Sequence, residues 1–207
     1  MLSNKEAQKL IDLGNICIDG IAIYENCFLS DASEIKLNNE IVRPRKEFVY
    51  LLFNKPVGFE STLNKNIDKN LSSFFEDFEG LSIAGRLDKA SEGLLLLSND
   101  GKWVENLCNP KFEKEKEYIV TLNKEVTNEF IEHFKTGVSI DKIITKKCVC
   151  EKINKNNIKV VLKEGKNRQI RKMCKVLGYE VLTLKRTRIA DFLLTDLQPG
   201  SYLVTKI

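Results

Sequence analysis

The sequence lacks the residue groupings that mark disulfide-bonded, metal-binding and membrane-spanning proteins. Its six cysteines include no Cys-x-x-Cys pair, and no cluster of His, Cys and Asp residues indicates a metal site. No apolar run approaches the roughly 18 residues of a membrane span. The first residues lack the basic-then-apolar order of a signal peptide. We therefore expect a cytoplasmic protein with no disulfide, no metal and no membrane segment.

Positive charge is concentrated in one segment rather than spread over the chain. The whole sequence carries a net charge of only +4, which by itself does not indicate a nucleic-acid partner. Between residues 164 and 188, however, eight basic residues stand against two acidic ones. Such a local excess is typical of a surface that contacts a polyanion. A solvated helix face beside a charged strand is the alternative explanation.

Local signals divide the chain into a short N-terminal module and a longer second part. Ser3 and Glu6 form a capping-box pattern that predicts a helix, and Asp19-Gly20 predicts a two-residue hairpin. A basic, proline-bearing joint then separates this module from the rest of the chain. We therefore expect an α/β module over residues 1–45 and the main domain over residues 46–207.

The second part mixes strand-like and helix-like stretches without the regular alternation of a parallel sheet. This order predicts an α+β fold with a mainly antiparallel, mixed sheet. Strands are expected at residues 48–53, 81–84, 93–97, 117–122, 144–153, 158–162, 180–188 and 202–205, and helices at 67–75, 102–108, 128–135 and 168–177.

A polar loop between two apolar strands contains the residues that could carry chemistry. It holds Arg86 and Asp88, and the strand-like run that follows is rich in leucine. Loops fixed by a rigid sheet are common places for catalytic groups. On composition alone, a simpler explanation is favoured, in which Asp88 caps a turn and Arg86 is its surface partner.

Separated motifs, in order along residues 47–207, resemble those of the RsuA/RluB/RluE/RluF-type pseudouridine synthases. The central motif contains Gly-Arg-Leu-Asp, a leucine-rich strand and Asn-Asp-Gly, and runs from Gly85 to Gly101. Within the family, the resemblance is closest to the RluF branch, which acts on large-subunit ribosomal RNA. The other matching segments are Lys55-Pro56-Val57-Gly58, Lys116-Glu117-Tyr118, the run from Leu162 to Met173 and the stretch from Arg186 to Leu203.

The resemblance implies a role for each of five residues. Pseudouridine formation breaks the bond between N1 of uracil and the ribose and rejoins the base through C5, which needs a carboxylate but no redox step. Asp88 would be that carboxylate, acting either as nucleophile at C1′ or as base at C2′, and Arg171 would be its ion-pair partner. Tyr118 would stack on the extracted uracil, Arg86 would fill the gap left in the RNA, and Leu162 would supply an apolar wall.

The helix expected over residues 168–177 has one basic and one apolar face. Its spacing predicts that the apolar side docks on the core while the basic side faces phosphate or the active-site carboxylate. A merely solubilising face would normally include glutamates for i,i+4 pairs, and this one has none. The basic residues are Arg168, Arg171, Lys172 and Lys175, and the apolar ones are Ile170, Met173, Cys174 and Leu177.

The N-terminal module resembles an S4 RNA-binding domain. It departs from that pattern at Asn4, where Arg is frequent, and at Asp19, where Asn is frequent, and the first helix of the module is missing. We therefore expect a truncated S4-like domain, with a purely structural cap as the alternative. The residues that would contact RNA are Lys5, Lys9, Arg43 and Arg45.

These features together predict an enzyme that isomerises one uridine in ribosomal RNA, most simply in large-subunit (23S) rRNA. It would act as a monomer, without cofactor or metal. Small-subunit rRNA or a tRNA stem-loop are alternative substrates, because RNA shape rather than a sequence motif sets target choice. The rival class is a non-catalytic S4-type RNA-binding protein for ribosome assembly. Such a protein would be expected to have lost Asp88, Tyr118 or Arg171, and all three are present.

Overall fold

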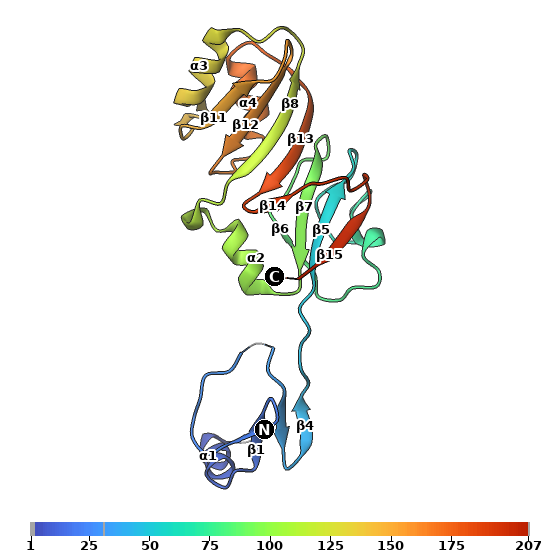
Figure 1. Cartoon of the computed structure of the whole chain (residues 1–207), viewed down its shortest axis with the longest axis vertical. Coiled ribbons are helices and arrows are strands. Elements are labelled where there is room, and N and C mark those ends of the chain that lie inside the picture. Colours follow the sequence, from blue (N-terminus) through green and yellow to red (C-terminus); the bar gives the residue numbers. More distant parts are fainter. Residues whose placement is uncertain (1–2, 31, 207) are drawn as a thin grey trace. The chain divides into compact units, whose positions relative to one another are not determined.

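The chain divides into two units, Met1–Phe48 and Val49–Ile207, in a computed structural model that describes residues 3–30 and 32–206. The first unit contains one helix and a four-stranded antiparallel sheet in the order β2-β1-β3-β4 (Figure 1). Its elements are α1 (Asn4–Asp12), β1 (Ile16–Ile18), β2 (Ile21–Ile23), β3 (Ile35–Leu37) and β4 (Glu40–Arg43).

The capping box and the hairpin turn that the sequence predicts at the start of this unit are both confirmed. The Ser3 hydroxyl accepts from the backbone N–H of Glu6, and the Glu6 carboxylate accepts from the backbone N–H of Ser3 at 2.8 Å. Asp19 and Gly20 join β1 to β2 with φ values of 49° and 85°. Positive φ at both central residues gives a hairpin turn whose twist matches the flanking strands.

The second unit is built on a nine-stranded mixed sheet over its described residues, so the predicted α+β class is confirmed (Figure 1). The strand order is β11-β12-β8-β13-β7-β5-β15, with β6 on β7 and β14 on β13. Neighbouring strands in this order are antiparallel except β13 and β7, which are parallel. The strands are β5 (Tyr50–Lys55), β6 (Ser82–Ala84), β7 (Glu92–Ser98), β8 (Lys116–Leu122), β11 (Val149–Lys152), β12 (Asn157–Leu162), β13 (Val181–Ile189), β14 (Phe192–Leu193) and β15 (Tyr202–Thr205).

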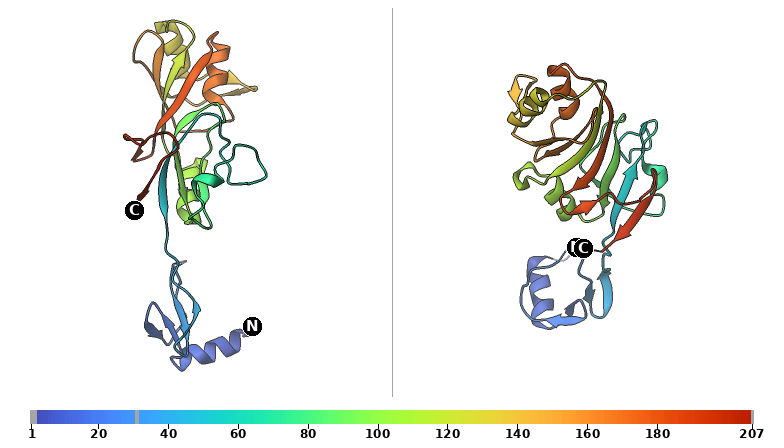
Figure 2. Two further views of the ribbon diagram at one scale, coloured as in Figure 1. Left: turned by 90° about the vertical axis from the view of Figure 1, so that its right-hand side faces the viewer. Right: turned by 45° about the horizontal axis from the view of Figure 1, so that its top comes forward.

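Helices cover this sheet at two places. The helices α3 and α4 pack on the half that contains β8, β11, β12 and β13, whereas α2 packs on β6 and β7. Figure 2 shows β13 running through the unit from the α4 end towards β14. The remaining elements are α2 (Gly101–Cys108), α3 (Asn128–Thr136), α4 (Gln169–Val176), the short hairpin β9 (Ser139–Ile140) and β10 (Ile143–Ile144), and the 3₁₀ turns Ser72–Phe74 and Pro110–Phe112.

The leucine run of β7 is apolar without alternation because both faces of this central strand are buried. Leu95 and Leu97 belong to the main core, together with Leu51 and Phe53 of β5. Leu94 and Leu96 belong to a second cluster with Leu107 of α2. The strand that follows the Asp88 loop is therefore held by packing on both sides.

The prediction of a helix over residues 67–75 is wrong. Only a 3₁₀ turn forms there, at Ser72–Phe74. The Asn70 side chain accepts from the backbone N–H of Ser72 at 2.7 Å and donates to the carbonyl of Ile67 at 2.8 Å. Such local bonds from asparagine compete with the hydrogen bonds of a helix. The strand predicted from residue 144 also begins later, at Val149.

A glycine is required at position 93, where β7 pairs in parallel with β13. It has a φ of 106°, and a Cβ atom there would lie 2.3 Å from the carbonyl oxygen of Arg186. We expect Gly93→Ala to lower the free energy of unfolding by about 3 kcal/mol or more, because backbone strain and a backbone clash add. Chemical denaturation measures this. Gly101→Ala is the control, since nothing lies within 4 Å of its Cβ position and its φ is ordinary, and an equal loss there would contradict the explanation.

Candidate active site

A cleft of about 210 Å³ lies where the loop between β6 and β7 faces the loop between β12 and α4. Its lining contains most of the residues that the sequence motifs singled out, although those residues are far apart along the chain. They are Arg86, Asp88, Tyr118, Leu162, Arg168 and Arg171.

The backbone next to Asp88 is fixed by a buried hydroxyl from another segment. Ser61 Oγ donates to the carbonyl of Leu87 at 2.7 Å and accepts from the backbone N–H of Leu87 at 3.0 Å. The carbonyl of Asp88 itself accepts from the backbone N–H of Ser91 at 2.9 Å. These bonds leave the Asp88 side chain projecting from a rigid turn. Sequence reasoning missed Ser61, which carries no motif signal of its own.

The side chain of Arg186 binds the backbone of the same loop. Sequence reasoning did not identify Arg186 as a site residue. Its side chain is 1% exposed, although the sequence placed it within a surface charge cluster. Its Nε donates to the carbonyl of Leu94 at 2.7 Å, and its Nη atoms reach the carbonyls of Arg86 and Gly85 at 3.4 and 3.5 Å. A buried guanidinium thus ties the start of β7 to the loop that carries Asp88.

The predicted ion pair between Arg171 and Asp88 is not formed among the described residues. Asp88 instead pairs with Arg168, whose Nη1 lies 3.6 Å from Oδ2. Arg168 precedes α4 in a left-handed conformation, with φ 51°, so its side chain leaves the loop rather than the helix. Arg171 lies further into α4.

The guanidinium of Arg171 forms hydrogen bonds with the turn that follows Asp88. Its Nη2 donates to the carbonyl of Ala90 at 2.9 Å and to Ser91 Oγ at 3.2 Å, and its Nη1 donates to Val181. Its buried Nε has no hydrogen-bond partner. Burial and the charge of Arg168 lower the pKa of Arg171, and Asp88 opposes that effect.

The cleft lining also contains Tyr118, Leu162 and the basic residue Lys116. Tyr118 lies on β8 beside Arg186 of β13, and Leu162 ends β12; both are buried. Lys116 lies two residues before Tyr118, and burial lowers its pKa, assisted by Arg186. An aromatic ring, an aliphatic side chain and a carboxylate therefore line the same small cleft.

The RNA pseudouridylate synthase family has a sequence model that matches residues 49–175. The chain belongs to this family. The synthase is 37% identical over 204 residues to "Dual-specificity RNA pseudouridine synthase RluF" of Salmonella typhi, which covers 97% of this chain and 70% of the relative. It is 33% identical over 158 residues to "Ribosomal small subunit pseudouridine synthase A" of Escherichia coli K12, covering 74% of this chain and 68% of the relative.

Its fold is also that of a solved structure, described as "Crystal structure of pseudouridylate synthase". The TM-score is 0.73 at 29% identity, covering 99% of this chain and 91% of the other. The predicted family, including the likeness to its RluF branch, is therefore confirmed.

The motif residue Lys55 of the synthase is buried, with no exposed surface. Its Nζ donates to the carbonyls of Pro56 and Phe59 at 2.9 and 2.8 Å. Burial lowers its pKa to about 8, although the nearby Glu60 and Asp88 carboxylates oppose this. The sequence indicated only a strand break here, whereas the structure shows a cation that closes the turn.

The basic stripe of α4 is divided between two surroundings. Arg168 and Arg171 enter the cleft, but Lys172 and Lys175 do not line it. Lys172 Nζ lies 2.5 Å from the Asp141 carboxylate, and Lys175 is exposed. On the opposite face Ile170, Met173 and Cys174 are buried, as predicted.

The four basic residues predicted to contact RNA in the N-terminal unit lie at its surface with different partners. Lys5 and Lys9 are exposed on α1. Arg45 is paired with Asp19 at 2.8 Å, and Arg43 donates to the carbonyl of Ser30 at 3.0 Å.

The cysteines of the synthase are free. Burial raises the pKa of Cys148 to about 11 and that of Cys174 to about 12, which makes both thiols unreactive at neutral pH. Over residues 3–30 and 32–206, no group of three or more His, Cys, Asp or Glu side chains could hold a metal ion. No helix in these ranges has the length and apolar character needed to cross a bilayer.

Proposed function

We propose that this synthase converts one uridine of ribosomal RNA into pseudouridine, with Asp88 as the catalytic carboxylate. The observation that carries the proposal is the cleft in which Asp88, an arginine and a tyrosine ring lie together. The likeness to the RluF branch favours large-subunit (23S) rRNA as the target. The synthase would act as a cytoplasmic monomer, because its chemistry needs no second subunit.

The reaction is an isomerisation, so no atom is gained or lost overall. The bond between N1 of uracil and C1′ of the ribose breaks, the base turns, and C5 bonds to C1′. The proton on C5 is lost and N1 gains one. Asp88 either attacks C1′ or removes the proton from C2′, and both steps need an ionised carboxylate held close to the sugar.

Cations lie next to Asp88 in a cleft that RNA would close to water, where they would stabilise negative charge. Arg168 provides the direct ion pair. Arg171 remains a catalytic candidate because its buried Nε has no partner in the free protein. An unsatisfied buried donor costs about 1–3 kcal/mol, and a bound substrate or a small shift of Asp88 would satisfy it.

The remaining cleft residues act on the extracted base. Tyr118 stacks on the uracil close to C5, and Leu162 provides the apolar wall. Arg86, which is exposed at the edge of the cleft, fills the space that the base leaves in the RNA. Base extraction costs a few kcal/mol, which stacking and inserted side chains offset.

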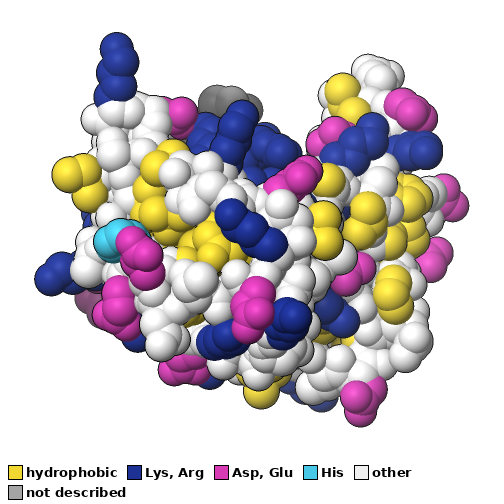
Figure 3. All heavy atoms as spheres, turned by 90° about the horizontal axis from the view of Figure 1, so that it is seen from above, with side chains coloured by type: hydrophobic (Ala, Val, Ile, Leu, Met, Phe, Trp, Pro, Cys, Tyr) yellow, Lys and Arg dark blue, Asp and Glu magenta, His cyan; other side chains and the backbone are white. Residues whose placement is uncertain are grey.

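The N-terminal unit acts as an S4-like RNA-binding domain. Its contribution is electrostatic, through Lys5, Lys9 and Arg43 together with Arg45. The Arg45–Asp19 ion pair is exposed, so exchanging it for a phosphate costs little. Figure 3 looks down on the second unit, at the end where α3 lies, and there Lys and Arg side chains are interspersed with Asp and Glu.

Lys175 tests whether RNA extends over the outer face of α4. We expect Lys175→Ala to lower the slope of log Kd against log salt by about 0.7 to 0.9, the value for one phosphate contact. Lys172→Ala should lower it less, because Lys172 is already paired with Asp141. Filter binding of an rRNA fragment over a range of salt concentrations measures both. Unchanged slopes in both variants would mean that RNA does not reach this face.

The proposed function is tested by mapping pseudouridines in rRNA from a strain that lacks the gene. One site should lose its pseudouridine, and the wild-type gene should restore it while the Asp88→Asn gene should not. If every rRNA site keeps its pseudouridine, the proposal fails. If Asp88→Asn restores a ribosome-assembly defect of the deletion strain, the RNA-binding assembly factor is the better explanation.

A further inference from the structure

The loop between β12 and α4 places Arg168 next to Asp88, and the backbone of Arg168 has a conformation that other contacts must stabilise. Arg168 has φ 51° and ψ 33°, a left-handed conformation that residues other than glycine rarely adopt without restraint. Among the residues that the structure describes, its side chain pairs with Asp88 but makes no hydrogen bond that would fix this backbone. The restraint must therefore come from the residues on either side.

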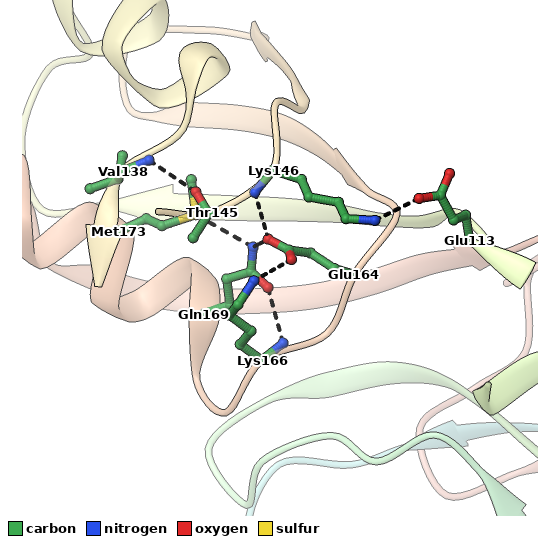
Figure 4. Close-up of polar contacts among 8 residues, drawn as sticks. All are labelled: Glu113, Val138, Thr145, Lys146, Glu164, Lys166, Gln169 and Met173. Carbon is green, nitrogen blue, oxygen red and sulfur yellow. Dashed lines mark hydrogen bonds and ion pairs between the residues drawn. The ribbon is translucent and has the colours of Figure 1, made fainter. Parts of the chain in front are cut away.

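Glu164 provides the first part of that restraint. Its side chain is 12% exposed and lies at the base of the loop (Figure 4). The carboxylate accepts from the backbone N–H of Lys146 at 2.9 Å, from Gln169 Nε2 at 2.7 Å, and from Lys166 Nζ. Burial alone would raise the pKa of Glu164, but these donors outweigh it and lower the pKa. The carboxylate is thus ionised at neutral pH.

Gln169 provides the second part, from the first residue of α4. Its side chain is 4% exposed. Figure 4 shows that its amide turns back into the loop, where Nε2 donates to Glu164 and Oε1 accepts from the backbone N–H of Lys166 at 3.0 Å. Gln169, immediately after Arg168, is therefore tied to Glu164 and Lys166, which precede Arg168 in the same loop.

We propose that Glu164 and Gln169 are positioning residues that set the rate of the chemical step by holding Arg168 against Asp88. The inference rests on the proposed function, because it assumes that the Arg168–Asp88 pair serves catalysis. Neither residue needs to touch the substrate. If these residues contributed only to the stability of the fold, the effect of replacing them on the rate would not depend on whether Arg168 is present.

A double-mutant cycle separates positioning from stability. We expect Glu164→Ala to lower the single-turnover rate about tenfold or more, because misplacing a catalytic group by a fraction of an ångström to one ångström costs up to about 100-fold. In an Arg168→Ala background, the same change should lower the rate less than about twofold, since the group being positioned is gone. RNA affinity should change little in either background. Glu164→Gln should retain most of the rate, since its amide oxygen can still accept from Lys146 and Gln169.

Glu113→Gln is the matched control. It removes the same charge from the outer end of the same network, where Glu113 pairs with Lys146 at 2.6 Å in an exposed position, and it should leave the rate within about twofold. If Glu164→Ala does not fold, Gln169→Ala replaces it in the cycle with the same criterion.

The cycle overturns the proposal if Glu164→Ala lowers the rate equally in both backgrounds, or if Arg168→Ala has the wild-type rate. Asp88→Asn is assayed in parallel. If that variant is active, the proposed function itself fails. If it is inactive and the cycle is additive, only the positioning role is lost.

Discussion

Asp88→Asn is expected to abolish pseudouridine formation while leaving the fold and RNA binding nearly unchanged. The amide keeps the shape of the side chain but can neither attack C1′ nor remove a proton from C2′. The turn that carries residue 88 should persist, because Ser61 and Ser91 hold it through backbone groups. Single-turnover assays with a labelled rRNA fragment, thermal denaturation and RNA binding measure the three properties separately.

Asp77→Asn is the control for this change. Asp77 is exposed in the second unit and should tolerate the same substitution with full activity. Activity of Asp88→Asn within tenfold of wild type would refute the catalytic assignment. A loss of RNA binding as large as the loss of rate would point instead to a damaged cleft.

Arg171→Ala is expected to lower the single-turnover rate about 100-fold or more, with a much smaller effect on RNA affinity. Its guanidinium donates to Ala90, Ser91 and Val181, so its removal frees the turn that follows Asp88. A displacement of about 1 Å at a catalytic group costs on the order of 100-fold in rate. Lysine should rescue poorly, because one ammonium cannot reproduce the planar, several-point geometry of guanidinium.

The measurement is the rate constant and the dissociation constant of Arg171→Ala and Arg171→Lys on the same RNA. Lys175→Ala, from the exposed side of the same helix, is the matched control and should leave the chemical rate unchanged. If Arg171→Ala weakens binding with an unchanged chemical rate, Arg171 is only a phosphate contact.

The sequence predicted the cleft because its motifs lie in loops and at strand ends that a sheet brings together. Asp88, Tyr118 and Leu162 line one cleft. The helical spacing placed Arg168 and Arg171 on one stripe but could not tell which one pairs with Asp88. That choice depends on the left-handed backbone of Arg168, which a side-chain pattern does not reveal.

The supporting residues could not be predicted for a different reason. Arg186 and Lys55 resemble surface cations in the sequence, yet both are buried. Their partners are backbone carbonyl groups, which every residue carries and which leave no signature in the sequence. Ser61 is similar, since its hydroxyl recognises only the backbone of Leu87.

The contact between Arg186 and the start of β7 has a consequence for how the enzyme is made. Arg186 and Leu94 are 92 residues apart in the chain, so loop closure must precede any gain from this contact. During synthesis, which proceeds from the N-terminus, the Asp88 loop leaves the ribosome long before the arginine that anchors it. We therefore expect the Asp88 carboxylate to be among the last groups to reach its native position, so that a nascent or C-terminally shortened chain has no activity towards the RNA around it.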